Sequence, residues 1–397
     1  MAGDDRDRDG GAYRRDSPRL QRRQRLTLGG VPVRPRIKDE HRPVRFGDGW
    51  IRIGGEVFGI AAELRDRDGA VWALLDLLDG TRTVSRVVTD LADRFPDSCP
   101  DEVVAAIETL AELGYVEDAD EPAVVALTPR QLERHSRSRS LYRWIDLRRR
   151  SSSWDFQVLL AQARVVLVGV GGVGCTAALS LVMSGVGRLH CVEPDVVELS
   201  NLGRQILYAE EHLGLLKVDV AVDRLRAANS DVEVTGEPTR IGDVASLRRL
   251  AADCDVLIMT ADHPSEIRTW TNQACTSTGT PWVYGGYHGP QVNLGVYRPG
   301  AGPCYECARL AEQDRDAARP PLATWRPAAT IPAHAANAVT AGVAGNLVAH
   351  AVMCLITDAP KLALNCQYGF SLVTMDHSFV TSLETPHAEC RTCRAAG

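Results

Sequence analysis

The run GVGGVG contains residue types that bring a backbone close to phosphate groups. Its glycines are Gly169, Gly171, Gly172 and Gly174, and Glu193 follows after a further apolar segment. Glycines permit close approach of a ligand, and the free N–H groups of a following helix attract phosphate. A carboxylate at the position of Glu193 can accept hydrogen bonds from ribose hydroxyls. These residues predict a nucleotide-binding site.

Three elements are needed to hold this turn and its carboxylate. The apolar run 165–168 predicts a strand before the turn, residues 173–186 predict a helix after it, and residues 188–192 predict a second strand that leads to Glu193. The same arrangement would serve an NAD-dependent oxidoreductase equally well. Such an enzyme does not need the polar run SNLGRQ at residues 200–205, nor the paired cysteines described below. Both features therefore disfavour the oxidoreductase.

The residues after the second expected strand resemble those of the ThiF/MoeB/MccB-type adenylyltransferases of the ubiquitin-activating superfamily. The resemblance adds further nucleotide-binding residues to the glycine turn. This sequence differs from the family at the ribose position, where relatives usually carry aspartate and this chain has Glu193. The residues that match are Glu193, Asp195, Ser200, Asn201, Leu202, Arg204, Gln205, Gly214 and Lys217.

The resemblance also assigns roles to two residues farther from the turn. Asp262 follows the run DVLIMTA and stands at the family's magnesium-binding position. Arg143 stands in the frame of an arginine that, in relatives, reaches the triphosphate from the partner subunit. The resemblance therefore implies a homodimer in which each subunit completes the site of the other.

The chemistry of adenylation explains why these residue types are needed. A carboxylate attacks the α-phosphorus of ATP and expels pyrophosphate, so the reacting groups are all negative and catalysis depends on positioning and charge neutralisation. Arg204 and Lys217 would neutralise phosphate oxygens, and Mg²⁺ on Asp262 would bridge them. Asn201 would donate a neutral hydrogen bond. Lys217 is one of only three lysines in a chain whose other cationic side chains are arginines, so composition alone does not account for it.

Two CxxC pairs, Cys304 with Cys307 and Cys390 with Cys393, form the second chemical motif. Four thiolates in two such pairs fit a closed, structural Zn²⁺ site that leaves no position for water. A redox motif would normally be a single CxxC near the start of a helix. The resembled family carries paired knuckles in its C-terminal half, so a structural Zn²⁺ that fastens the last residues to the domain is expected.

The other seven cysteines mostly lie in apolar runs, where cysteine behaves as a small buried hydrophobe. They are Cys99, Cys175, Cys191, Cys254, Cys275, Cys354 and Cys366. Many relatives pass the adenylate to a cysteine after the first zinc pair, but this chain has none between Ala308 and Met353. A thioester step on that loop is therefore not expected. His334 in the same loop is expected to be exposed rather than to act on substrate.

Length and composition limit the remaining possibilities. A chain of 397 residues with 45% apolar content can form two cores, and its net charge of −6 carries no nucleic-acid signature. We find neither a signal peptide nor an apolar run long enough to span a membrane, which favours a cytoplasmic protein. Residues 1–42 mix arginine, aspartate, glycine and proline with few large apolar residues, so they are expected to form a disordered tail.

Residues 43–118 predict a separate winged-helix domain. Strands are expected at 44–46, 50–53 and 57–60, and helices at 70–78, 84–95 (capped by Thr83) and 101–113. The segments 74–83 and 110–118 resemble PqqD-like modules that recognise leader peptides of ribosomally made, modified peptides. The resemblance implies that an extended peptide pairs with an open strand edge. The alternative is a winged-helix domain that only packs against the neighbouring domain, or one that binds DNA.

Together the patterns predict an α/β fold with a doubly wound, mostly parallel, Rossmann-like sheet at residues 151–397, stapled by zinc. A connecting segment at residues 119–150 joins this domain to the winged-helix domain. The expected function is ATP-dependent adenylation of a carboxylate on a ribosomally made peptide. Other peptide-modifying enzymes would be further partners. The alternative function is a non-catalytic, ThiF-like leader-binding adaptor for a YcaO azoline-forming cyclodehydratase.

Overall fold

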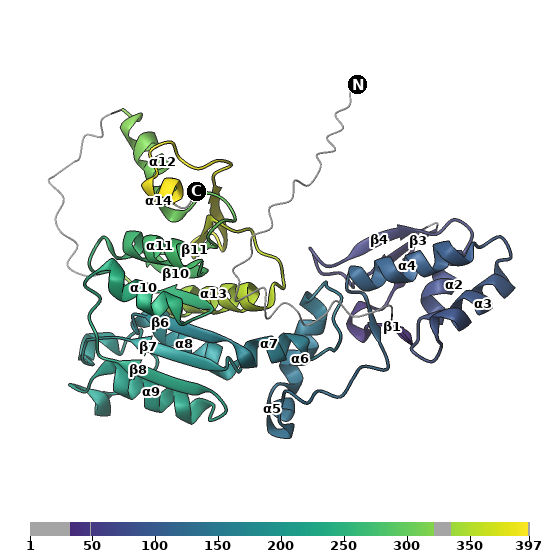
Figure 1. Cartoon of the computed structure of the whole chain (residues 1–397), viewed down its shortest axis with the longest axis horizontal. Coiled ribbons are helices and arrows are strands. Elements are labelled where there is room, and N and C mark those ends of the chain that lie inside the picture. Colours follow the sequence, from purple (N-terminus) through teal and green to yellow (C-terminus); the bar gives the residue numbers. More distant parts are fainter. Residues whose placement is uncertain (1–31, 48, 321–334, 396–397) are drawn as a thin grey trace.

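The computed structural model describes residues 32–47, 49–320 and 335–395. A small N-terminal part lies beside a larger α/β domain, and three helices connect them (Figure 1). The connecting helices are α5 (Pro129–Arg134), α6 (Ser136–Ile145) and α7 (Asp155–Gln162). The aromatic ring of Tyr142 on α6 stacks on Phe156 of α7, with ring centroids 3.6 Å apart. Both rings belong to the hydrophobic core of the large domain, so this contact joins the connecting helices to that domain.

The N-terminal part packs three helices on a three-stranded antiparallel sheet of order β2-β3-β4. Ile51 and Ile53 of the middle strand are fully buried in its core. The hydroxyl oxygen of Thr83 accepts a hydrogen bond from the Arg86 N–H and so caps α3, as expected from the sequence. The elements are β2 (Val44–Phe46), β3 (Trp50–Ile53), β4 (Ala62–Arg65), α2 (Ala70–Leu77), α3 (Val84–Arg94) and α4 (Pro100–Glu112).

Two expectations for this part are wrong. Residues 57–60 form a turn rather than a strand, because Gly54, Gly55 and Gly59 have positive φ angles that reverse the chain before β4 begins. The ordered part also begins before residue 43. Strand β1 (Pro35–Ile37) pairs antiparallel with β5 (Val116–Asp118), and η1 (Asp39–His41) follows it. A strand of three residues is too short to produce a recognisable pattern in a polar segment. Residues 1–31 lie outside the described residues.

The large domain is built on one sheet of eight strands in the order β13-β12-β11-β10-β9-β6-β7-β8. The pairs from β10 to β8 are parallel, and the pairs from β10 to β13 are antiparallel. This confirms the predicted α/β, doubly wound sheet. Its strands are β6 (Arg164–Val168), β7 (Arg188–Val192), β8 (Glu233–Glu237), β9 (Val256–Met259), β10 (Trp282–His288), β11 (Gln291–Tyr297), β12 (Cys366–Ser371) and β13 (Asp376–Ser382).

Helices cover both faces of this sheet (Figure 1). Helices α8 (Gly172–Met183), α9 (Lys217–Ala228) and α13 (Ala338–Thr357) pack on one another or on the sheet on one face, and α10 (Val244–Ala252) and α11 (Ile267–Thr278) pack together on the other. The remaining elements of the domain are η2 (Leu199–Asn201), η3 (Glu210–His212), α12 (Tyr305–Ala317) and α14 (Arg391–Ala395).

Helix α13 corrects the expectation that no apolar run could span a membrane. Its 20 residues are long and apolar enough by length and composition. However, 61% of its most apolar window is buried inside the protein, and the helix packs against α8 and β10. Its apolar character is therefore explained by its place in the core of the α/β domain.

Candidate active site

A cleft of about 470 Å³ opens at the carboxyl ends of the parallel strands. This is where open α/β sheets bind ligands, because the strand order reverses there. The cleft brings together ten of the residues predicted from the sequence, although they come from three separate segments that follow β6, β7 and β9. These residues are Gly169, Gly171, Gly172, Glu193, Asp195, Asn201, Arg204, Gln205, Lys217 and Asp262.

The glycine turn after β6 is shaped by close packing. Gly169 has a φ of +94°, and a Cβ atom there would lie 2.5 Å from the backbone nitrogen of Ala261. Gly174 does not line the cleft, but a Cβ atom there would collide with the carbonyl oxygen of Gly169. Because α8 begins at Gly172, its free N–H groups lie at the edge of the cleft. The turn is thus built to let a phosphate approach the helix N-terminus.

Glu193 connects the glycine turn to the loop after β7. Its Oε2 accepts a hydrogen bond from the N–H of Val170 at 2.8 Å, and its Oε1 accepts one from the N–H of Asp195 at 3.0 Å. Only 6% of the residue is exposed. A carboxylate oxygen can accept two hydrogen bonds, so both oxygens retain capacity for a ribose hydroxyl. The glutamate side chain therefore holds the turn as well as facing the cleft.

A Glu193→Gln substitution is expected to lower the free energy of unfolding by about 1–3 kcal/mol, because one of the two backbone N–H groups would face an amide NH₂ instead of an acceptor. Chemical denaturation measures this change. The matched control is Glu233→Gln, since Glu233 is a 56% exposed partner of Arg188 and should change stability by less than about 0.5 kcal/mol. Equal effects of the two substitutions would contradict the bridging role of Glu193.

The polar run after Glu193 forms a short, well-bonded segment. The side chain of Asn201 accepts a hydrogen bond from the N–H of Glu198 at 3.0 Å, which fixes η2. Arg204 donates to the carbonyl oxygen of Ser200 at 3.0 Å. Gln205 is 3% exposed, and its Oε1 is a buried oxygen without a hydrogen-bond partner among the described residues. These contacts hold the guanidinium of Arg204 at the rim of the cleft.

Asp195 links two cations on the other wall of the cleft. Its carboxylate lies 3.8 Å from Nζ of Lys217 and 3.2 Å from Nη2 of Arg240. Lys217 is only 7% exposed and is the first residue of α9. Asp262 follows β9, and its half-exposed side chain lines the cleft. The cationic side chains suit a polyphosphate, and the carboxylate of Asp262 suits the Mg²⁺ that accompanies one.

Sequence reasoning missed two arginines of the cleft, Arg240 and Arg268. Arg240 follows β8, and Arg268 lies on the first turn of α11, which follows Asp262. Both stand shortly after parallel strands, where side chains meet at one edge of the sheet. Their position after predicted strands is the feature of the sequence that could have identified them. Neither residue belongs to a recognisable motif.

Arg143 lies outside the cleft of its own chain. Its guanidinium pairs with Glu117 at 2.8 Å and with Glu40 at 3.2 Å, and its side chain is only 12% exposed. Both carboxylates belong to the N-terminal part, so Arg143 fastens α6 to that part. To reach a partner's triphosphate it would have to leave both carboxylates, and its role as a trans arginine therefore stays a prediction.

An Arg143→Ala variant is expected to lose up to about 3 kcal/mol of stability in the N-terminal part, because two largely buried carboxylates lose a counter-ion. Glu117 keeps Arg36 at 2.8 Å, which limits the loss. The ATP affinity should stay within about twofold of wild type. Thermal unfolding and ATP titration calorimetry measure the two quantities, with Arg137→Ala on the exposed face of α6 as control. A fall in ATP affinity without a loss of stability would instead support the trans arginine.

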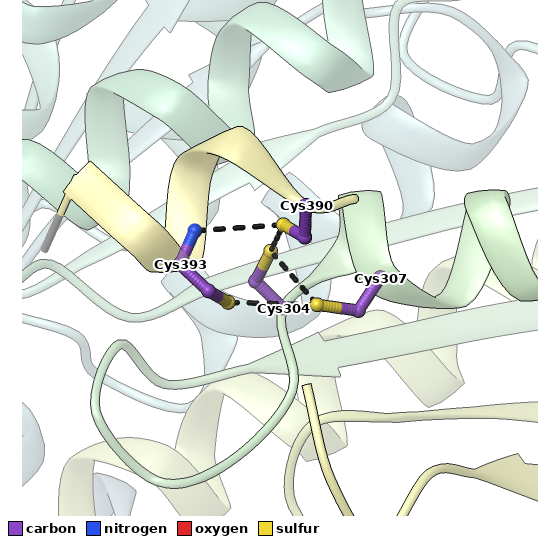
Figure 2. Close-up of side chains that lie close together, drawn as sticks. All are labelled: Cys304, Cys307, Cys390 and Cys393. Atoms are coloured by element: carbon purple, nitrogen blue, oxygen red, sulfur yellow. Dashed lines mark hydrogen bonds between the residues drawn. The ribbon is translucent and has the colours of Figure 1, made fainter. Parts of the chain in front are cut away.

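The four predicted zinc ligands lie together between α12 and α14 (Figure 2). Their Sγ atoms are all within 4.8 Å of one another. The distances are 3.9 Å for Cys304–Cys307, 3.6 Å for Cys304–Cys390 and 3.5 Å for Cys307–Cys393. Tetrahedral Zn²⁺ with Zn–S bonds of about 2.3 Å places sulfurs about 3.8 Å apart. The cluster therefore fits a closed Zn²⁺ site.

Neighbouring side chains hold this cluster in place. The Asn272 side chain of α11 donates to Cys304 Sγ at 3.3 Å and accepts from the N–H of Tyr305 at 3.2 Å. Glu306 accepts hydrogen bonds from the hydroxyl and the N–H of Thr392. Hydrogen bonds of this kind orient metal ligands. They join the C-terminal knuckle to the helix that carries Arg268.

The remaining cysteines do not contribute to the cleft. Burial raises the pKa of the Cys175 and Cys191 thiols to about 12, so these groups stay protonated and inert near neutral pH. Among the residues that the structure describes, none that lines the cleft is a cysteine. The expectation for His334 falls on a residue outside the described ranges.

Comparisons with known proteins agree with this geometry. The adenylyltransferase and sulfurtransferase MOCS3 of Culex quinquefasciatus is 38% identical over 151 residues, covering 38% of this chain and 34% of that protein. The sulfur carrier protein ThiS adenylyltransferase of Bacillus subtilis (strain 168) is 31% identical over 246 residues, covering 60% of this chain and 66% of the relative. The chain thus spans about a third of the first relative's length and just under two thirds of the second's.

Solved structures share the fold. E. coli MccB with ATP superposes with a TM-score of 0.66 at 21% identity, covering 90% of this chain and 99% of MccB. PaaA superposes with a TM-score of 0.61 at 23% identity. The family model described as ThiF family matches residues 146–392, which is more than half of the chain. The chain belongs to the ThiF family.

Proposed function

We propose that this protein is an ATP-dependent adenylyltransferase that activates a carboxylate. The observation that carries the proposal is the cleft, which gathers Arg204, Lys217, Glu193 and Asp262 beside the glycine turn. The ribose would bind Glu193, and the phosphates would lie over the N-terminus of α8. Magnesium held by Asp262 would neutralise phosphate charge.

The residues of the chain would lower the barrier mainly through charge. Arg204 and Lys217 would bind the phosphate oxygens that leave as pyrophosphate, and Asn201 would donate a further hydrogen bond. A hydrogen bond from Arg204 to Ser200 and an ion pair between Lys217 and Asp195 already hold the two cations near these positions. A preorganised site of this kind does not need to reorient during the reaction.

The substrate that we propose is a peptide. The N-terminal part has open strand edges at β2 and β4, where an extended leader could add a strand. MccB has been solved with MccA, and its chain matches this one over almost its whole length. Because none of the described cleft residues is a cysteine, the adenylate would react without a thioester intermediate. We further propose a cytoplasmic homodimer.

The alternative adaptor function would not need a charged nucleotide site. The cleft retains Arg204, Lys217 and Asp262 together, and this favours the enzyme. Titration calorimetry with ATP and Mg²⁺ distinguishes the two functions. Micromolar binding is expected for the enzyme, followed by ATP–pyrophosphate exchange that depends on added peptide. A folded protein that binds no ATP would overturn the proposed function, and exchange without peptide would exclude a peptide substrate.

A further inference from the structure

The two ends of the cleft are chemically different. The end beside β6 and β7 holds the glycine turn and Glu193, which suit the phosphates and the ribose. The end beside β10 is lined by Arg268, His263, Gly286 and Tyr287. Because β9 lies between β6 and β10 in the sheet, a nucleotide on the β6–β7 side leaves the β10 side for the second reactant.

Arg268 is the cation of this second end. Its guanidinium stacks on Tyr284, with its central carbon 4.7 Å from the ring centroid, so its plane is held by an aromatic face. Within the described ranges no ion pair involves Arg268, whereas Arg240 and Lys217 both pair with Asp195. A Cβ atom at position 286 would lie 3.4 Å from Nη2 of Arg268, so the guanidinium lies directly beside the backbone of Gly286 in the cleft.

The helix that carries Arg268 is held in place by hydrogen bonds of its second turn. Asn272 lies one turn farther along α11 and hydrogen-bonds both Cys304 and the N–H of Tyr305. Residues four apart share one face of a helix. Arg268 therefore extends from a helix whose adjacent turn is anchored at the four-cysteine cluster, and its position relative to the cleft is well defined.

We propose that Arg268 binds the substrate carboxylate that is activated, and this inference rests on the proposed function. An arginine can hold a carboxylate through two parallel N–H···O bonds, which a lysine cannot reproduce. One carboxylate oxygen forms the new bond to the α-phosphorus while the bond to pyrophosphate breaks. Arg268 stays protonated and keeps its contact with the other oxygen. It thus brings an anionic nucleophile to an anionic phosphate.

ATP–pyrophosphate exchange with three pools of random N-acetyl pentapeptides tests the inference. One pool has free C-termini and no acidic side chains, one has amidated C-termini with a single Asp or Glu, and one has no carboxylate. Wild type should exchange with one of the first two pools, which identifies the carboxylate, and not with the third. Arg268→Ala should raise KM by about 10- to 100-fold, and Arg268→Lys should restore only part of the loss.

ATP affinity separates this inference from the proposed function. Arg268→Ala should bind ATP within about twofold of wild type, as should the control Arg224→Ala on the exposed side of α9. Undiminished exchange in Arg268→Ala would overturn the inference. A parallel fall in ATP affinity would overturn it too, by assigning Arg268 to the triphosphate, as would wild type that binds ATP but exchanges with none of the pools. Absence of ATP binding in wild type would overturn the proposed function itself.

Discussion

Replacing Asp262 with alanine is expected to remove magnesium-dependent ATP binding and to lower peptide-dependent pyrophosphate exchange by at least about 10²-fold. A metal ion that neutralises phosphate charge contributes several kcal/mol to the transition state, and each 1.36 kcal/mol is a tenfold change in rate. Asp262 is the carboxylate that follows β9 and lines the cleft, and its side chain is 53% exposed. Its removal should therefore leave folding intact.

Two measurements make this result specific. ATP titration calorimetry with and without Mg²⁺ should show that Asp262→Ala loses the magnesium-dependent part of the affinity, whereas the thermal midpoint stays unchanged. Asp253→Ala is the matched control, because Asp253 precedes β9 at the opposite end of the strand and is 83% exposed. If Asp262→Ala binds ATP·Mg²⁺ as tightly as this control, Asp262 does not hold the metal.

The sequence predicted the parts of the site that depend on local pattern. The glycine turn, Glu193 and the SNLGRQ run are each set by neighbours along the chain, and the structure gathers them in one cleft. The two cysteine pairs were recognisable for the same reason, since each pair is local and a four-ligand site requires both.

The parts that were missed depend on contacts between distant segments. The strand β1 is defined by its pairing with β5, some eighty residues away, and its three residues carry no pattern of their own. The motif that singles out Arg143 likewise does not reveal its ion pairs with carboxylates of the N-terminal part, while its role as a trans arginine stays a prediction. Arg268 is positioned by contacts with Tyr284 and Gly286 of β10, and no spacing along the chain predicts these contacts.

Loss of zinc is expected to destabilise the α/β domain by about 4 kcal/mol. A ligand that binds only the folded state at a free concentration of about 1,000 times its Kd contributes roughly this amount. For a domain of this size the thermal midpoint should fall by about 10 °C. The cluster fastens α14 to the start of α12 together with the Thr392–Glu306 hydrogen bonds, so its loss loosens the C-terminal knuckle (Figure 2).

A Cys390→Ser variant tests this, with Cys99→Ser as control because Cys99 is an exposed cysteine outside the cluster. Wild type and control should contain one zinc per chain by elemental analysis, and the variant should contain none. The hydrogen bond from Asn272 to Cys304 extends the consequence to the cleft. Once that anchor of α11 is weakened, peptide-dependent exchange should fall more than ATP affinity, because Arg268 lies at the substrate end while Glu193 and the glycine turn do not depend on α11. An equal thermal midpoint in Cys390→Ser and Cys99→Ser would show that the cluster does not stabilise the fold.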